Sequence, residues 1–170
     1  DLPGRFETGT QSLEGQAGAL GAVDYLEWVG QTMGTEFKIA NRSHTERTSN
    51  VHAGLRAMAS YEETLSTRLI EGLVGFDDVI VHGITDPAQF AKRVPTVSIS
   101  KPGMRPADMA TALDDRGIFV WDGHSYALDV VEWLGLADKG GVVRFGPTHY
   151  NTIEEIDFTL EVVADFLRRG

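Results

Sequence analysis

The sequence predicts an α/β fold in which helices pack on a sheet, and two observations carry this prediction. After Asn50, the apolar patterns follow one another in the order helix, strand, strand, helix, strand, helix, strand, helix. One sheet with helices laid against it is the most economical way to bury such an alternation. The composition agrees, because 42% hydrophobic and 24% charged residues are ordinary for a globular chain of 170 residues.

The charge and composition exclude several classes of function. A net charge of −10 with 15 scattered basic residues argues against nucleic-acid binding, which needs clustered Lys and Arg against phosphates. The chain contains no cysteine, so it can form no disulfide and offers no thiolate ligand or cysteine nucleophile. No apolar run reaches transmembrane length and no signal peptide opens the chain, so we expect no membrane partner and a cytoplasmic location. The opening residues, DLPGR, read like a loop inside a longer protein.

The first 50 residues predict one helix between two polar segments. Residues 5–21 are rich in Gly and small polar side chains. They run into a predicted buried helix that contains Val23, Leu26, Trp28 and Val29. Residues 30–50 have almost no apolar content in their second half, so they predict a long surface loop or hinge.

Gly9 and Thr10 stand just before that first helix. Backbone amides and a hydroxyl in a glycine-rich turn can cradle a phosphate, since the helix dipole also favours an anion there. The alternative is ordinary turn chemistry, which is the commoner role of Gly and Thr in a loop. From the residues alone, both interpretations stay open.

A strong amphipathic helix is predicted over residues 51–73, and Gly72 and Gly75 bring it to an end. Its apolar positions recur at three- and four-residue spacing and are Leu55, Met58, Tyr61, Leu65 and Leu69. Short strands follow at residues 78–82 and 96–100, with a loop or helical turn at 86–93 between them.

The next segment predicts a helix that Pro106 starts and Gly117 caps, with an apolar stripe of Met109, Ala112 and Leu113. Residues 118–121 (IFVW) then predict a buried strand. A polar loop at 122–126 and a short helix at 128–134 come next.

The C-terminal part of the sequence predicts a strand that passes directly into a helix. Residues 142–145 read as the strand, and Thr152 and Glu155 form a capping box, in which each side chain satisfies a free amide at a helix start. The terminal helix has one core face, made of Ile153, Ile156, Leu160, Val163 and Leu167.

Arg144 lies in that strand, and its guanidinium fork can offer two parallel donors to a carboxylate if it faces a cleft. The alternative is an edge-strand arginine that pairs with one of the many surface acids. The other polar candidates gather in two loops, at residues 121–126 and at His149 with Tyr150.

Familiar catalytic signatures are otherwise absent from the sequence. None of the five histidines forms an H-x-H or H-x-x-x-H pair, so a metal hydrolase would need His82, His124 and His149 to meet from distant positions. The acid pairs 114–115 and 154–155 are neighbours on helices and point in different directions, so we expect them on the surface. No G-x-S-x-G, Walker loop or G-x-G-x-x-G occurs.

Three stretches, taken together and in order, resemble one known family. RFETGTQSLEGQAGALGAVDYLEWVG, GIFVWDGHSYA and VRFGPTHYNTIEEID are similar to segments of the class V aminotransferase and cysteine desulfurase family, pyridoxal-phosphate enzymes of fold type I. The resemblance spans nearly the whole chain and is closest to the cysteine desulfurase-like subgroup. It implies the C-terminal small domain of such an enzyme, with a mixed sheet and packed helices, together with the end of the large domain.

The resemblance also implies roles for particular residues. Arg144 matches the family arginine that binds the α-carboxylate of the substrate. Gly9 and Thr10 match the Gly-Thr pair that approaches the cofactor phosphate from the partner subunit of a homodimer. Trp121, His124 and Tyr126 lie in the loop that borders the active-site mouth, which makes them candidates for the substrate pocket. The implied cofactor is pyridoxal 5'-phosphate and the implied substrate is a small amino acid.

Two departures from the family pattern qualify the expected activity. Cysteine desulfurases carry R-x-G-H-H-C in the loop, and the cysteine takes up sulfur as a persulfide, but Tyr126 stands at that place here. A transaminase, lyase or epimerase reaction therefore stays open. The family's Schiff-base lysine lies upstream of the R-F-E-x-G-T segment and matches none of the lysines here, which are Lys38, Lys92, Lys101 and Lys139.

We therefore expect residues 1–50 to be the end of the cofactor-binding domain with a linker, and residues 51–170 to be the small domain. On this reading the chain alone is inactive, and the rest of a longer enzyme supplies the lysine. The alternative is a free-standing α/β binding or interaction module that keeps the small-domain fold without catalysis.

Overall fold

The computed structural model describes residues 4–39, 43 and 45–169. The chain divides into two compact units, Asp1–Met58 and Ala59–Gly170, and their boundary falls inside the long helix α2 (Glu46–Val74). The predicted division at residue 50 into parts of a large and a small domain stays a prediction. None of the helices in the described ranges is both long and apolar enough to span a bilayer.

The first unit consists of helices. A 3₁₀ turn, η1 (Gly4–Phe6), precedes α1 (Leu13–Thr32), whose first turn is capped by Ser12 accepting the Gly15 amide at 3.2 Å. A second 3₁₀ turn, η2 (Thr35–Phe37), and the start of α2 at Glu46 then replace much of the loop predicted over residues 30–50. That prediction was wrong because an exposed first turn carries no apolar periodicity, and α2 starts instead on the Thr45 hydroxyl, which accepts the Thr48 amide at 3.2 Å.

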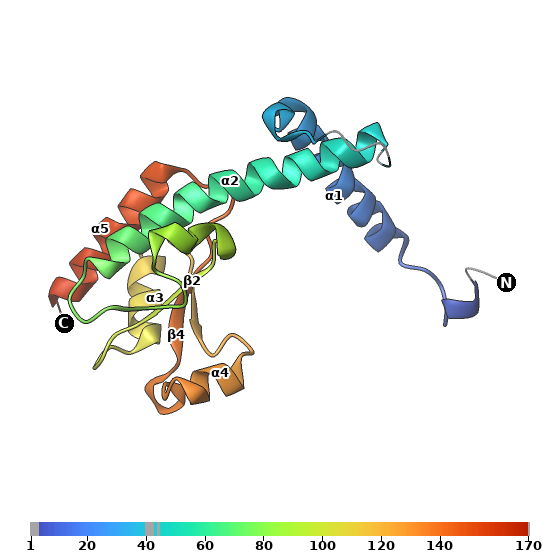
Figure 1. Ribbon diagram of the computed structural model, residues 1–170. Helices are drawn as coiled ribbons and strands as arrows, with labels where there is room; N and C mark the ends of the chain where they lie inside the picture. The colour runs from blue at the N-terminus through green and yellow to red at the C-terminus, as the bar shows by residue number, and fades with distance from the viewer. Residues whose placement is uncertain (1–3, 40–42, 44, 170) are drawn as a thin grey trace. The chain divides into compact units, whose positions relative to one another are not determined.

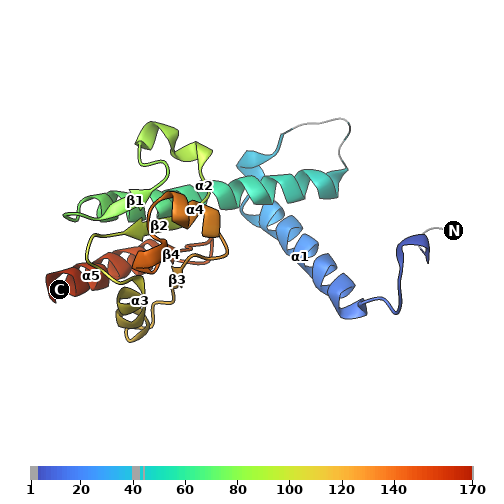
Figure 2. The same ribbon diagram turned by 90° about the horizontal axis from the view of Figure 1, so that it is seen from below.

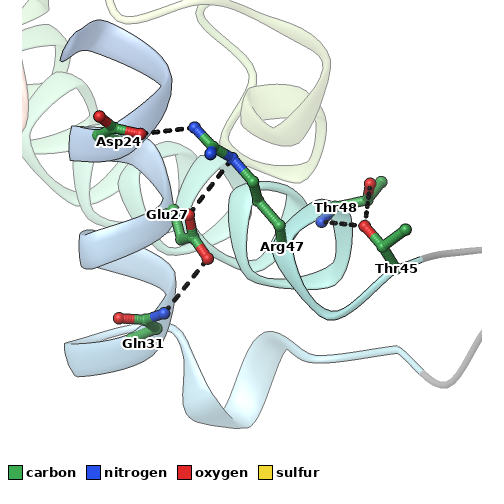
Figure 3. Close-up of polar contacts among 6 residues, drawn as sticks. All are labelled: Asp24, Glu27, Gln31, Thr45, Arg47 and Thr48. Carbon is green, nitrogen blue, oxygen red and sulfur yellow. Dashed lines mark hydrogen bonds and ion pairs between the residues drawn. The ribbon is translucent and has the colours of Figure 1, made fainter. Parts of the chain in front are cut away.

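Helix α1 crosses the first part of α2 with the two backbones nearly in contact (Figure 2). A Cβ atom added to Gly30 would lie 1.8 Å from the Asn50 carbonyl oxygen, so only glycine fits there. Arg47 of α2 joins the two helices by pairing with Asp24 and Glu27 of α1 (Figure 3).

The predicted burial of α1 is wrong for most of the helix. Within its described residues only Val29 and Gly30 are buried, while Trp28 is 55% exposed and Leu20 is 56% exposed. The apolar pattern identified a helix correctly, but the described residues of the first unit form no core that covers the rest of its apolar side chains.

The second unit is built on a four-stranded sheet with the order β1-β2-β4-β3, and its two central strands, β2 and β4, are labelled in Figure 1. The strands are β1 (Ile80–His82), β2 (Val97–Ser100), β3 (Trp121–Gly123) and β4 (Val142–Phe145). The predicted α/β fold is confirmed, and the helices and strands after residue 50 occur in the predicted order. All pairings are antiparallel, so the described part of the predicted mixed sheet contains no parallel pair.

One face of the sheet packs against helices and forms the core. The helices are the second half of α2, α3 (Pro106–Asp114) and α5 (Ile153–Arg169). The sheet contributes alternate residues of its two central strands, namely Val97, Ile99, Val143 and Phe145. The helices contribute residues that include Leu65, Leu69, Met109, Leu113, Leu160 and Val163. This period-2 burial leaves the other residues of the same strands on the opposite face.

The prediction of a buried strand at residues 118–121 is wrong. The strand begins at Trp121 and runs to Gly123, and Phe119 is 83% exposed. Ile118 and Val120 do pack against the core, so the apolar run alternates between core and solvent instead of being buried on both sides.

Three short helices complete the unit. They are η3 (Pro87–Lys92), α4 (Leu128–Trp133) and η4 (Ala137–Lys139). Val131 of α4 and Leu136 form a small cluster with Val142 at the beginning of β4. This cluster covers one end of the sheet face that the core helices leave free.

Candidate functional site

The end of β4 and the start of α5 are fixed as the sequence predicts. Thr152 accepts the Glu155 amide at 3.2 Å, and Glu155 accepts the Thr152 amide at 2.9 Å. The capping box is therefore confirmed, and it anchors α5 directly behind the strand that carries Arg144.

Arg144 lies on the sheet face opposite the core. It pairs with Ser98 of β2 and with Trp121 of β3, and His82 of β1 pairs with Ser98. Directly opposed residues of antiparallel strands share a face, so His82, Ser98, Arg144 and Trp121 form one row across the sheet. We call these four residues the cross-strand row.

The Arg144 side chain is half-buried. Within the described part of the chain, no carboxylate forms an ion pair with it and no hydrogen bond occupies its guanidinium. The surface ion pair weighed as an alternative is thus not formed by the described residues. A half-buried guanidinium with five unused donors is chemically suited to bind an anionic ligand.

His82 lies at one end of the cross-strand row, and Trp121 lies at the other. Its Nε2 atom lies 2.9 Å from the Ser100 hydroxyl, and Ser100 is only 6% exposed. Burial lowers the pKa of His82 below its usual value, because the protonated ring loses hydration there. The imidazole is therefore neutral at pH 7 and forms a neutral hydrogen-bonded pair with Ser100.

The loop that follows Arg144 is held by α2. Glu62 accepts the backbone amide of His149 at 3.2 Å and lies 3.3 Å from its Nδ1, and Tyr61 donates to the Asn151 carbonyl at 2.9 Å. Glu62 was not singled out from the sequence. No local signal marks it, because its partner is 87 residues away.

The predicted mouth residues lie in β3 and in the turn that follows it. Trp121 belongs to the cross-strand row, next to Arg144. His124 and Tyr126 lie in the turn beyond β3, where the Tyr126 amide donates to His124 Nδ1 at 3.1 Å and Tyr126 is 92% exposed. Ser125 and Tyr126 have φ values of 46° and 63°, a left-handed conformation that is costly for residues other than glycine. Ser125 Oγ is buried in this turn without a described hydrogen-bond partner.

Gly9 and Thr10 lie in the first unit, in an exposed bend before Ser12 and the start of α1. A Cβ atom added to Gly9 would meet nothing within 4 Å, so the described part of this chain does not enclose the bend.

Two cavities open on the second unit. The larger, of about 660 Å³, lies at the end of the sheet where β2 finishes and β4 starts, and its walls include His82 and Ser100. The smaller, of about 550 Å³, lies beyond the end of β4 and is bordered by Phe119, Tyr150 and other residues. Arg144 lines neither, so it belongs to an open face next to the larger cavity.

A metal centre finds no support in the described ranges, which contain no group of three side chains that could hold a metal ion. Of the histidines considered for a metal hydrolase, His82 bonds to Ser100, His149 bonds to Glu62, and His124 accepts a backbone amide.

Comparison with known proteins identifies the family. The sequence model of the family described as aminotransferase class-V matches residues 49–158. The chain is 41% identical over 104 residues to the aminotransferase-like protein FGM3 of Gibberella zeae, a match that covers 59% of this chain and 25% of that protein. It is 30% identical over 169 residues to a probable cysteine desulfurase of Methanothermobacter thermautotrophicus, covering 96% of this chain and 35% of that protein.

Solved structures give the same result for the fold. The apo structure of the cysteine desulfurase from Thermococcus onnurineus NA1 is similar with a TM-score of 0.60 and 30% identity, over 74% of this chain and 32% of that chain. The cysteine desulfurase CsdA of Escherichia coli is similar with a TM-score of 0.57 at 20% identity, which speaks for the fold alone. The chain spans about a third of the length of these structures. By its sequence and its fold, this chain belongs to the class V aminotransferase family.

Proposed function

We propose that this chain is the C-terminal part of a pyridoxal-phosphate enzyme that acts on an amino acid, and that Arg144 binds the α-carboxylate of the substrate. The observation that carries the proposal is the state of Arg144. Its guanidinium is half-buried on the face of the sheet opposite the core helices, and no described carboxylate neutralises it. A ligand carboxylate is the partner that this geometry suits, because two parallel N–H···O bonds match the guanidinium fork.

The neighbours of Arg144 assist this role. Trp121 stands opposite it on β3, on the same face of the sheet, and is 57% exposed, so its indole ring is accessible to the same ligand. Phe145, which points to the core, and the capping box behind it hold the strand in place. In this role the arginine orients a substrate by its carboxylate.

The residues present fit the proposed cofactor to a limited extent. When bound, pyridoxal phosphate supplies an electron sink for charge that develops on the substrate's α-carbon. The amide of Gly9 and the hydroxyl of Thr10 would hold its phosphate, and their exposed bend leaves room for the partner subunit of a homodimer. We propose that the Schiff-base lysine lies in another part of the protein.

The reaction is proposed only as chemistry at the α-carbon of an amino acid. Persulfide chemistry of the cysteine desulfurase type is disfavoured, because a tyrosine hydroxyl at position 126 cannot take up sulfur as a thiolate does. The alternative function, a non-catalytic binding module, is favoured by one observation, namely that no lysine of this chain matches the family's Schiff-base lysine.

The test uses the protein that contains this chain together with the rest of its polypeptide. We expect Arg144→Gln to raise KM for the amino-acid substrate by about 10- to 100-fold, the loss of one or two charge-assisted hydrogen bonds. Arg116→Gln is the matched control, because Arg116 follows α3 and stacks at 5.3 Å over Phe158 of α5, on the helical side.

The competing outcomes are distinct. An unchanged KM in Arg144→Gln for every amino acid that is turned over would refute the role of Arg144. A protein that neither acquires the visible absorption of bound pyridoxal phosphate nor consumes any amino acid would favour the binding module. Sedimentation of the same sample tests the proposed homodimer.

A further inference from the structure

The larger cavity is lined by charged and polar side chains that have no role in the proposed function. It lies at the end of the sheet where Ser100 closes β2 and Gly141 precedes β4. The turn at residues 101–105, the start of α3 and the η4 segment form its other walls. Its volume of about 660 Å³ is within the range of small-molecule sites.

Three cations lie on these walls, in a protein whose net charge is −10. They are Lys101 and Arg105, from the turn at residues 101–105, and Lys139, from the η4 segment. Lys101 is already engaged, since it donates to the Asp77 carbonyl at 2.9 Å and lies 3.6 Å from an Asp78 oxygen. Within the described residues, neither Arg105 nor Lys139 forms an ion pair or a side-chain hydrogen bond.

The cavity also has two acidic residues, Asp122 and Asp138. Neither forms an ion pair with a cation in the part of the chain that the structure describes, so they do not neutralise Arg105 and Lys139 by contact. Because Lys101 is paired with Asp78, the wall cations without a described counter-charge are Arg105 and Lys139, and they equal the two wall acids in number.

The inner wall supplies a buried polar group. The Ser100 hydroxyl is 2.9 Å from His82 Nε2, and when the imidazole donates this hydrogen bond the Ser100 proton remains free for another acceptor. Ser100 is 6% exposed and lines the cavity, so that proton can reach a ligand only from the cavity side. The walls of one cavity thus combine a buried hydroxyl with a guanidinium and an ammonium, and these donors suit a multivalent oxygen acceptor.

We propose that this cavity binds a small oxyanion, a phosphate or dicarboxylate group, held by Arg105 and Lys139 with the Ser100 hydroxyl beneath it. The site is separate from the Arg144 carboxylate site, and it does not depend on the proposed catalytic function. Arg105 supplies the planar fork from the turn at residues 101–105, and Lys139 supplies a mobile point charge from the η4 segment.

The experiment is isothermal titration of the protein with inorganic phosphate and, separately, with malonate, in chloride buffer at constant ionic strength. We expect saturable binding, weakened about tenfold by Arg105→Gln and severalfold by Lys139→Gln. Lys92→Gln is the charge-matched control, because Lys92 ends η3 and lines neither cavity. Circular dichroism establishes that each variant is folded.

The outcomes distinguish a phosphate ligand from a dicarboxylate ligand. They also distinguish specific binding in this cavity from non-specific attraction and from binding at Arg144. Phosphate binding without malonate binding assigns a phosphate-bearing ligand, and the reverse assigns a dicarboxylate. Absence of both overturns the proposal, as does an equal loss in Lys92→Gln, which would mean non-specific attraction. Loss of binding in Arg144→Gln would also overturn it, because the anion would then be bound at the other site.

Discussion

Helices α1 and α2 cross closely. We therefore predict that a glycine-to-alanine substitution has opposite effects on stability at two positions of α1. Gly18 and Gly30 both lie in α1. A Cβ atom at position 18 would meet nothing within 4 Å, whereas one at position 30 would lie 1.8 Å from the Asn50 carbonyl oxygen. Gly18→Ala is therefore expected to stabilise the helix, and Gly30→Ala to destabilise its packing on α2.

The magnitudes follow from the two environments. Alanine is favoured over glycine inside a helix by about 0.8–1 kcal/mol, and at exposed position 18 nothing opposes that gain. At position 30 a carbon–oxygen contact needs roughly 3.3 Å, so the helices must part by roughly 1.5 Å. Overpacking of this kind costs about 1–3 kcal/mol, to which lost packing of Val29 and Ala53 adds. We expect the two variants to differ by about 2–4 kcal/mol.

The assay is hydrogen–deuterium exchange of the α1 amides, because it reports the local opening free energy of this helix rather than a global average. Since 1.4 kcal/mol is a factor of ten, amides of α1 should exchange up to about fivefold more slowly in Gly18→Ala. In Gly30→Ala they should exchange at least about tenfold faster near the crossing. Equal protection in Gly30→Ala and the unsubstituted protein would show that the helices do not pack backbone to backbone, and the reasoning would fail.

Two further predictions concern the second unit. Thr152→Ala should lower the free energy of unfolding by about 1 kcal/mol, because the Glu155 amide loses its acceptor, and a matched urea titration of Glu154→Ala, outside the capping box, should show a smaller change. For His82, burial lowers the pKa in the folded state, so stability is fully present above the usual value of 6.5 and decreases as pH falls below it. His82→Gln should remove that decrease in urea unfolding measured between pH 8 and pH 5, and parallel stability curves would contradict the assignment.

The sequence correctly predicted the features that depend only on residues close to one another in the chain. The strand at residues 142–145 and the capping box of Thr152 and Glu155 are both as predicted, since these features depend on alternation and on contacts three residues apart. The errors arose where burial depends on what lies opposite. The pattern in α1 indicates which residues are apolar, but Trp28 and Leu20 remain exposed because the described residues of the first unit do not cover them.

The candidate site was predictable only in part, for a related reason. Arg144 could be singled out from its place in a strand, and its partner Trp121 from its loop. Its other neighbours, Ser98 and His82, are known only once the strand pairing is known. Glu62, Arg105 and Lys139 carry no local signal, because distant parts of the chain bring them to their places.

The register of β4 joins the fold to the proposed function. Because side chains alternate, a shift of one residue would turn Arg144 into the core and move Val143 and Phe145 to the open face. Gly141 helps to prevent such a shift, since it has a φ of 86° and any Cβ there would lie 2.2 Å from the Gly123 carbonyl oxygen. The apolar residues that stabilise the core therefore also direct the guanidinium outward, and a loss of register would remove the proposed carboxylate site together with the core.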